Sequence, residues 1–331
     1  MDWFTVGFLA ISLSIFALTV VAERILIPIL QTKKMGQKIL DIGPRWHKSK
    51  EGTPTMGGIG FILATLLVLA VFFIVKGVLG TSAEYIPLAL TLIYAVANGA
   101  VGFVDDYFKL VIKKENEGLT LWQKLILQLV LSAAYVCVMR YTGCMETSLY
   151  LPLADRSVEL GWWYYPMAVL VLTGVVNGGN ITDGIDGLAS AVTLVIGVFF
   201  AVWAFSAREE QLSVIAAALI GASLGFLVYN YHPARVFMGD TGSLFFGALV
   251  IGAAFMMKNP IVGLMASAVF ILEMLSSLLQ MLYFKATHGK RLFKMAPIHH
   301  HFEKCGWSER TVMVRFSLAA ALFCLLGWFL L

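Results

Sequence analysis

The chain has 331 residues, of which 59% are hydrophobic and 13% are charged, and its formal net charge is +4. Its mean hydropathy of +0.83 excludes an ordinary soluble fold and is typical of polytopic membrane proteins. No G-x-x-x-x-G-K-[ST] motif occurs, which excludes a P-loop ATPase. The 4 cysteines show no spacing typical of metal ligands.

Long apolar segments recur along the whole chain. A hydrocarbon core about 30 Å thick needs about 20 apolar residues for each helix that crosses it. The sequence therefore predicts an all-α, polytopic integral membrane protein with ten transmembrane helices, in one domain that spans residues 1–331. The predicted spans are residues 4–27, 58–75, 86–104, 125–138, 162–176, 188–205, 212–228, 243–257, 261–283 and 312–331.

Basic residues predict the orientation of these spans. Most of the 24 Lys and Arg residues lie in the loops after the first, third, fifth, seventh and ninth spans, and such loops face the cytoplasm. Both termini are then extracytoplasmic. Asp2 is the only charged residue before the first span, so we expect a retained helix and not a cleaved signal peptide. The outward segment 145–161 is either a small hairpin or a plain loop.

The most polar stretch in an apolar context is N-G-G-N-I-T-D-G-I-D-G-L, residues 177–188. Its polar side chains recur at every third position, at Asn177, Asn180, Asp183 and Asp186. In a continuous helix each such step rotates the side chain by about 60°, so the first and last would point in opposite directions. We therefore predict that a helix ends or breaks here. A polar loop without function between two spans is the alternative.

Four further polar segments follow odd-numbered spans, and all of them are predicted to face the cytoplasm. They are residues 48–58, 105–109, 230–244 and 297–303. Each has a structural alternative: Asp105 and Asp106 could form a solvated helix end, Asp240 could cap a helix, and the three histidines could be interfacial. Together they predict a single cytoplasmic active-site cleft.

The donor types in these segments indicate a hard cation. Asp and Asn predominate and cysteine is almost absent, and oxygen ligands favour Mg²⁺ or Mn²⁺ over Zn²⁺. Mg²⁺ in proteins commonly accompanies phosphate. We therefore expect a polyanionic substrate, held by Mg²⁺, lysines and backbone amides.

The same segments closely match a known family over essentially the whole chain. The sequence resembles the phospho-N-acetylmuramoyl-pentapeptide transferases, bacterial members of the polyprenyl-phosphate N-acetylhexosamine 1-phosphate transferase superfamily. The resemblance rests on G-T-P-T-M-G-G (52–58), D-D-Y-x-K (105–109), N-x-T-D-G-x-D-G-L-A (180–189), F-M-G-D-T-G-S-L (237–244) and P-I-H-H-H-F-E (297–303). Small departures in spacer positions, such as Gly178, Gly179, Ile181 and Ile185, do not affect the polar residues.

The resemblance implies a Mg²⁺-dependent transfer of phospho-MurNAc-pentapeptide from its UDP carrier to undecaprenyl phosphate. The products are lipid I and UMP, in the first membrane step of peptidoglycan synthesis. It also implies a multi-pass protein of the bacterial inner membrane that forms a homodimer among membrane lipids, and no nucleic-acid partner is expected. In family members the ninth helix is broken and tilted, which leaves a groove for the lipid chain. Residues 280–294 fit the segment that emerges there.

The resemblance also implies roles for individual residues. Asp105, Asp106 and Asp240 correspond to the catalytic and metal-binding carboxylates, and His299 to a further catalytic residue. For Asp105, a role as general base and a role as metal ligand stay open. The positions that correspond to substrate-binding residues are Lys48, Thr53, Lys109, Lys124, Asn180, Asp183, Gly184, Asp186, Asn230, Phe237, His300 and His301.

Two other functions compete with this hypothesis. A sibling transferase that moves GlcNAc-1-phosphate would share most of the motifs, but the histidine segment and G-T-P-T-M-G-G argue against it. A secondary transporter would also contain intramembrane aspartates, yet its sites lie near the membrane midplane in repeated halves. Here the polar segments lie on one side, without a repeat.

Overall fold

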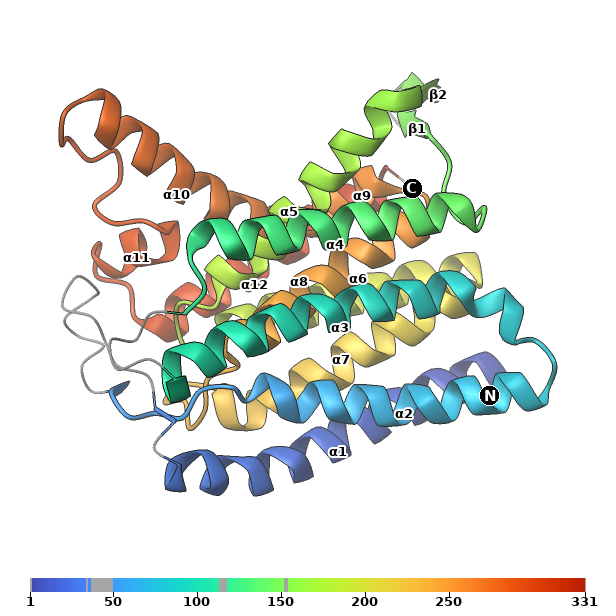
Figure 1. Ribbon diagram of the computed structural model, residues 1–331, viewed down its shortest axis with the longest axis horizontal. Helices are drawn as coiled ribbons and strands as arrows, with labels where there is room; N and C mark the ends of the chain where they lie inside the picture. The colour runs from blue at the N-terminus through green and yellow to red at the C-terminus, as the bar shows by residue number, and fades with distance from the viewer. Residues whose placement is uncertain (1, 34, 37–49, 113–117, 152–153, 331) are drawn as a thin grey trace.

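The computed structural model describes residues 2–33, 35–36, 50–112, 118–151 and 154–330. Within these residues it is helical apart from one short hairpin and an isolated bridge, which confirms the predicted all-α class (Figure 1). The long helices are α1 (Trp3–Thr32), α2 (Gly58–Val78), α3 (Ile86–Tyr107), α4 (Leu121–Tyr141), α5 (Tyr164–Thr182), α6 (Leu188–Ala207), α7 (Glu210–Asn230), α8 (Gly239–Met256), α10 (Ala268–Ala286) and α12 (Glu309–Trp328). Two short helices are α9 (Pro260–Ala266) and α11 (Ile298–Glu303).

Nine helices in the described part of the chain are long and apolar enough to cross a membrane, which confirms a polytopic membrane protein. The predicted fifth span corresponds to α5, which is not among the nine. This helix continues beyond the predicted span to Thr182, and its last turns carry Asn177 and Asn180. The predicted helix end thus lies within the stretch 177–188, but after its two asparagines.

The predicted span 261–283 is not one continuous helix. Asn259 accepts a hydrogen bond from the Val262 N–H and, with Pro260 at the first helical position, starts the short helix α9, which ends at Ala266. Helix α10 then begins in a new direction and projects from the bundle, at the upper left of Figure 1. Residues 280–286, the first part of the segment predicted to emerge, form the end of this projecting helix.

The two chain ends lie at the same end of the bundle. Both termini and the hairpin are on the right of Figure 1, whereas α11 is on the left. The hairpin consists of β1 (Ser148–Leu151) paired antiparallel with β2 (Arg156–Glu159). Of the two alternatives for segment 145–161, the structure has the hairpin.

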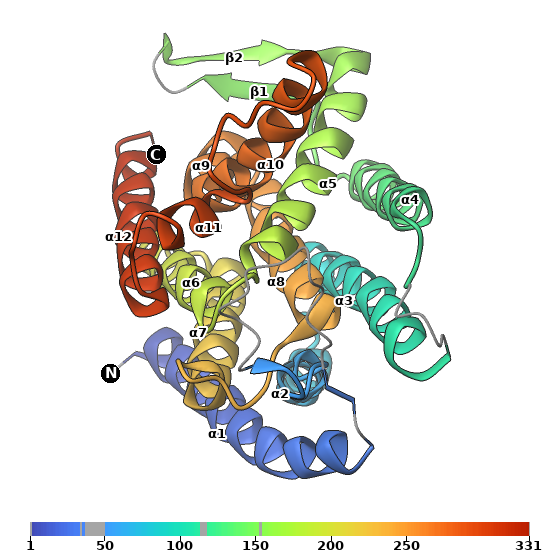
Figure 2. The same ribbon diagram turned by 90° about the vertical axis from the view of Figure 1, so that its left-hand side faces the viewer.

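Helix α8 is the centre of the bundle, and the other helices surround it (Figure 2). All of its residues from Thr241 to Met256 are buried. Gly58 of α2 and Gly102 of α3 lie so close to α8 that a Cβ atom at either position would overlap the backbone of α8. Small residues of this kind let membrane helices approach closely and gain van der Waals contact. The close approach brings the polar end of α3 against the start of α8.

One carboxyl group lies inside the bundle away from the polar end. Glu23 of α1 is completely buried, and neither of its carboxyl oxygens has a hydrogen-bond partner among the described residues. It packs against Gly60, where a Cβ atom would overlap Glu23 Oε1. A buried polar group without a partner destabilises the folded state.

We predict that Glu23→Met increases thermal stability. Methionine has a similar length and no group to desolvate, so the free energy of unfolding should rise by about 1–3 kcal/mol, the usual cost of an unsatisfied buried polar group. The measurement is the Tm of the purified protein in detergent. Glu209→Met, at an exposed position, should leave the Tm unchanged. A lower Tm for Glu23→Met would show that the carboxyl group stabilises the fold.

Candidate active site

Asp106, in the last turn of α3, connects this helix to the start of α8. The Asp240 N–H donates to Asp106 Oδ1 at 3.2 Å, and the Thr241 N–H donates to Oδ2 at 2.9 Å. The Thr241 hydroxyl also donates to Oδ2, at 2.7 Å. The first N–H groups of a helix have no partner within the helix and carry partial positive charge, so a carboxylate is stabilised there. Asp106 thus caps α8 from another helix and fixes the position of Asp240.

Asp105 and Asp240 share two lysine side chains. Lys109 Nζ lies 2.6 Å from Asp105 Oδ2 and 3.0 Å from Asp240 Oδ2. Lys124 Nζ lies 2.6 Å from Asp240 Oδ2 and 3.8 Å from Asp105 Oδ2. Carboxylate oxygens from two helices thus converge on positive charge. We call Asp105, Asp240, Lys109 and Lys124 the central charge cluster.

Local structure explains how α3 and α4 supply these groups. Helix α3 continues into a π-helical turn, Phe108–Ile112, which carries Lys109. The Leu119 N–H, just before α4, donates to Asp105 Oδ1 at 2.6 Å. Thr120 caps α4 and forms a capping box with Gln123, which fixes the first turn of the helix that carries Lys124. Asp105 therefore has both carboxyl oxygens engaged.

Helix α5 brings the stretch 177–188 to the same place. Asn180 Nδ2 donates to Asp240 Oδ1 at 2.9 Å, so Asn180 adjoins the central charge cluster. Asp183 is at the end of α5, and no described residue donates a hydrogen bond to its carboxyl group. Burial raises the pKa of Asp183 well above the usual carboxyl value, and the negative charges of Asp240, Asp106 and Asp186 raise it further. A positively charged ligand close to Asp183 would relieve this repulsion.

The three histidines of α11 have separate partners. His299 Nδ1 lies 2.9 Å from Glu273 Oε2 of α10, and both side chains are completely buried. The other ring nitrogen of His299 faces Gly184, where a Cβ atom would overlap it. His300 Nδ1 lies 2.6 Å from Glu303 Oε2, and His301 Nδ1 accepts a hydrogen bond from the Lys294 N–H at 3.1 Å. Of the three, His299 therefore directly adjoins the loop 183–187.

Two loop segments pair with each other beside this site. The Phe237 N–H donates to the Pro54 carbonyl at 2.8 Å, and the Gly57 N–H donates to the Phe237 carbonyl at 2.9 Å. These bonds bring together Thr53 and Phe237, both of which are half-buried. Lys48, predicted to bind substrate, lies outside the described residues.

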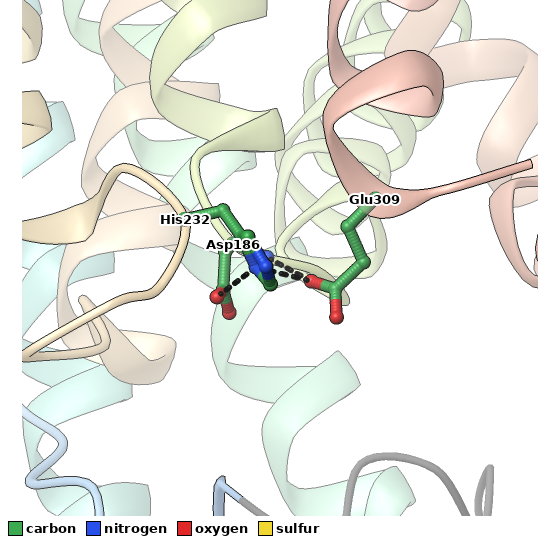
Figure 3. Close-up of side chains that lie close together, drawn as sticks. All are labelled: Asp186, His232 and Glu309. Atoms are coloured by element: carbon green, nitrogen blue, oxygen red, sulfur yellow. Dashed lines mark hydrogen bonds and ion pairs between the residues drawn. The ribbon is translucent and has the colours of Figure 1, made fainter.

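Two of the predicted substrate-binding residues are almost completely buried. Asn230 is 1% exposed, and its side-chain oxygen accepts from the Gly187 N–H at 3.2 Å while its amide donates to the Val236 carbonyl at 2.9 Å. Asp186 is also 1% exposed and lies beside His232 and Glu309 (Figure 3). In this conformation both residues connect loops to each other.

Four polar residues of this region were not predicted from the sequence. Lys50, His232, Glu273 and Glu309 contact predicted site residues. A signal existed for Glu273, because a carboxylate within an apolar span is rare and commonly functional. The other three belong to polar segments, where their residue type alone indicated no particular partner.

The central charge cluster and Asp183 supply only oxygen atoms as potential metal ligands. Asp105 Oδ2 and Asp240 Oδ2 lie 2.6 Å and 3.0 Å from the Lys109 ammonium group, so the two oxygens converge on one positive charge. Oxygen donors of this kind suit Mg²⁺. Both oxygens of Asp106 accept hydrogen bonds from the backbone at the start of α8, whereas Asp105 and Asp240 each pair with lysine ammonium groups, which a cation could replace.

Sequence comparison independently identifies the chain's relatives. Residues 88–258 match the family described as glycosyl transferase family 4. The phospho-N-acetylmuramoyl-pentapeptide-transferase of Caldicellulosiruptor bescii is 40% identical over 319 residues, which cover 96% of this chain and 95% of the relative. The proteins of the same name from Bacillus subtilis and Geobacillus kaustophilus are 41% and 42% identical, and in both cases 94% of each chain is covered. The chain therefore belongs to the phospho-N-acetylmuramoyl-pentapeptide-transferase family.

Proposed function

We propose that this chain transfers phospho-MurNAc-pentapeptide from UDP-MurNAc-pentapeptide to undecaprenyl phosphate, giving lipid I and UMP. The observation that carries the proposal is the central charge cluster, which joins carboxylates and lysines from α3, α4 and α8 in a chain that belongs to this family. Such a cluster suits two anionic substrates that must approach each other.

The reaction is a phosphoryl transfer, in which positioning and charge neutralisation provide most of the catalysis. A phosphate oxygen of the lipid forms a bond to the phosphorus that carries the sugar, and the pyrophosphate bond to UMP breaks. Lys109 and Lys124 neutralise charge on the phosphates when these displace the carboxylates from the ammonium groups. Asn180 and Asp106 keep Asp240 in place during this exchange.

We propose Mg²⁺ as the cofactor, held by Asp105 and Asp240. When bound, Mg²⁺ supplies Lewis-acid stabilisation of the pyrophosphate and the departing UMP. Asp105 lies beside the Lys109 ammonium group, at a position that holds positive charge, which supports the role of ligand. A base is not required, because a phosphate monoester with a second pKa of about 6 is mostly dianionic at neutral pH.

The remaining groups fit the nucleoside and its phosphates. Phe237 is half-buried beside segment 50–58 and offers an aromatic face to uracil. Asp183 and Gly184 lie in the loop 183–187, and Gly184 adjoins the buried His299. Contact of these three residues with the sugar or the phosphates stays a prediction. Lys48, Thr53, His300 and His301 stay predictions as substrate-binding residues.

We further propose that α5 is the tenth membrane crossing and that both termini are extracytoplasmic. With ten crossings, the polar end of the bundle faces the cytoplasm of the bacterial inner membrane, where basic loops belong. A UDP-linked donor reaches this side. The homodimer stays a prediction.

The choice of donor separates this proposal from its nearest alternative. Purified protein with undecaprenyl phosphate and Mg²⁺ should release UMP from UDP-MurNAc-pentapeptide at least about a hundredfold faster than from UDP-GlcNAc. The smaller donor lacks groups that would contact the protein in the transition state, and the loss of such contacts reduces turnover. Removing Mg²⁺ with a chelator should abolish the release, and adding Mg²⁺ back should restore it. UMP release from UDP-GlcNAc alone would indicate the sibling transferase.

The orientation is testable with single cysteines in a variant that lacks the four native ones. Ala286 and Ser82 are both exposed. Ala286 ends α10, which extends to the left of Figure 1, and Ser82 belongs to the connection between α2 and α3, which is on the right. An impermeant maleimide applied to intact cells should label Ser82→Cys and should label Ala286→Cys only after the membrane is opened. Labelling of Ala286→Cys in intact cells would contradict the proposed orientation.

A further inference from the structure

A second charged cluster lies beside the central one and has no role in the chemistry proposed above. Its side chains come from four separate parts of the chain: Lys50 precedes α2, Asp186 lies between α5 and α6, His232 follows α7, and Glu309 begins α12. Figure 3 shows the Asp186, His232 and Glu309 side chains pointing toward one another. We call these four residues the clamp.

Both oxygens of the Asp186 carboxylate accept hydrogen bonds from other parts of the protein. Lys50 Nζ lies 2.6 Å from Asp186 Oδ1, while His232 Nδ1 and the Ala234 N–H lie 2.9 Å and 3.0 Å from Oδ2. Since a carboxylate only accepts, His232 donates from Nδ1. The protein therefore holds the Asp186 carboxylate from three directions, and this side chain is 1% exposed.

Glu309 closes the clamp from the opposite side. Its Oε2 atom lies 2.5 Å from Lys50 Nζ and accepts a hydrogen bond from the Asp186 N–H at 3.2 Å. It thus contacts both the side chain that pairs with Asp186 and the backbone of Asp186. The loop 183–187 is consequently tied to α12 through its backbone as well as through charge.

The same residues could in principle hold a metal ion. Asp186, His232 and Glu309 each offer one potential ligand atom, and these three atoms lie within 4.8 Å of one another. The Lys50 ammonium, however, contacts two of the three groups at 2.6 Å and 2.5 Å and supplies the positive charge that a metal would bring. The arrangement is therefore an ion-pair network around the buried Asp186 carboxylate.

The position of the clamp in the chain indicates its purpose. Lys50 comes three residues before Thr53, Asp186 three residues after Asp183, and His232 five residues before Phe237. Phe237 and Asp183 are the residues assigned above to the nucleoside and its phosphates, and Thr53 is a predicted substrate-binding residue. Each of the three clamped segments thus carries a residue proposed or predicted to contact a substrate. Glu309 itself lies on a helix that carries none of those residues.

We propose that Lys50, His232 and Glu309 are positioning residues for the donor: through Asp186 they hold three nucleotide-binding segments in register with one another. This inference rests on the proposed function. The central charge cluster, and with it the lipid phosphate and the metal, does not depend on the clamp. Breaking the clamp should therefore weaken donor binding and leave the other substrate unaffected.

The first test is steady-state kinetics of Glu309→Gln, which keeps the side-chain shape and removes the charge. The KM for UDP-MurNAc-pentapeptide should rise about tenfold or more, with little change in kcat or in the KM for undecaprenyl phosphate. Lys50→Met should have a similar effect, and the double variant should be no worse than either single one because the two residues act together. Additive effects, or an unchanged donor KM, would overturn the proposal.

Two controls distinguish positioning from general stability. His232→Asn retains a donor near the position of Nδ1 and should keep most donor affinity, whereas His232→Leu should lose it. The Glu146–Lys258 ion pair, with 2.5 Å between its charged atoms, connects exposed residues elsewhere, and Glu146→Gln should leave the donor KM unchanged. Equal loss in His232→Asn and His232→Leu, or a raised donor KM in Glu146→Gln, would contradict a positioning role.

A readout independent of activity separates this inference from the proposed function. Backbone hydrogen exchange in Glu309→Gln should be faster than in the unmodified protein in the segments 50–58, 183–190 and 231–238, and unchanged in the hairpin. That result supports the clamp even if the unmodified protein transfers nothing from the UDP donor. Unchanged exchange in all three segments would overturn the clamp even if the transferase activity is established.

Discussion

The site depends on the contact between the end of α3 and the start of α8. Gly102 allows the two backbones to approach, and Asp106 then accepts hydrogen bonds from the Asp240 and Thr241 N–H groups. A carboxylate at this position satisfies unpaired donors and interacts favourably with the helix dipole. Asp105, the neighbour of Asp106, is thereby directed toward Asp240 and the two lysines.

Around this contact the protein balances opposite charges at the end of a membrane bundle. Buried carboxylates are costly unless they are paired, and here Lys109 and Lys124 pair with Asp105 and Asp240. Among the described residues Asp183 has no lysine partner, and burial together with the negative charges of Asp240, Asp106 and Asp186 raises its pKa. A site with paired lysines and a carboxylate that lacks a partner can exchange its internal ion pairs for phosphates and a cation. The clamp is a separate network, in which Lys50 pairs with both Asp186 and Glu309.

Much of this arrangement could be predicted from the sequence. The long apolar segments and the distribution of basic residues among the loops were sufficient to predict that Asp105, Asp183 and Asp240 lie on one side of a helical membrane protein. The helix end within residues 177–188 was predicted from the three-residue spacing, although α5 retains Asn180, whose amide donates to Asp240. The histidines were expected near the cleft, and His299 does adjoin Gly184.

Other features depend on tertiary contacts that a single sequence does not encode locally. Asp106 can cap α8 only because the start of α8 packs against the end of α3. Lys50 pairs with Asp186 and Glu309, which lie 136 and 259 positions further along the chain. The turn at Ser267 was not predicted because the apolar pattern continues through it. Such long-range pairings follow from the packing of the whole bundle.

We propose that Asp106 positions the site while Asp105 and Asp240 bind the cation. Titration of the purified protein with Mn²⁺, followed by electron paramagnetic resonance, measures cation binding directly. Asp105→Asn and Asp240→Asn should weaken Mn²⁺ binding by about a hundredfold, as expected for the loss of a charged ligand, whereas Asp106→Asn should weaken it by less than about tenfold. Loss of Mn²⁺ binding in Asp106→Asn as complete as in Asp240→Asn would contradict the account.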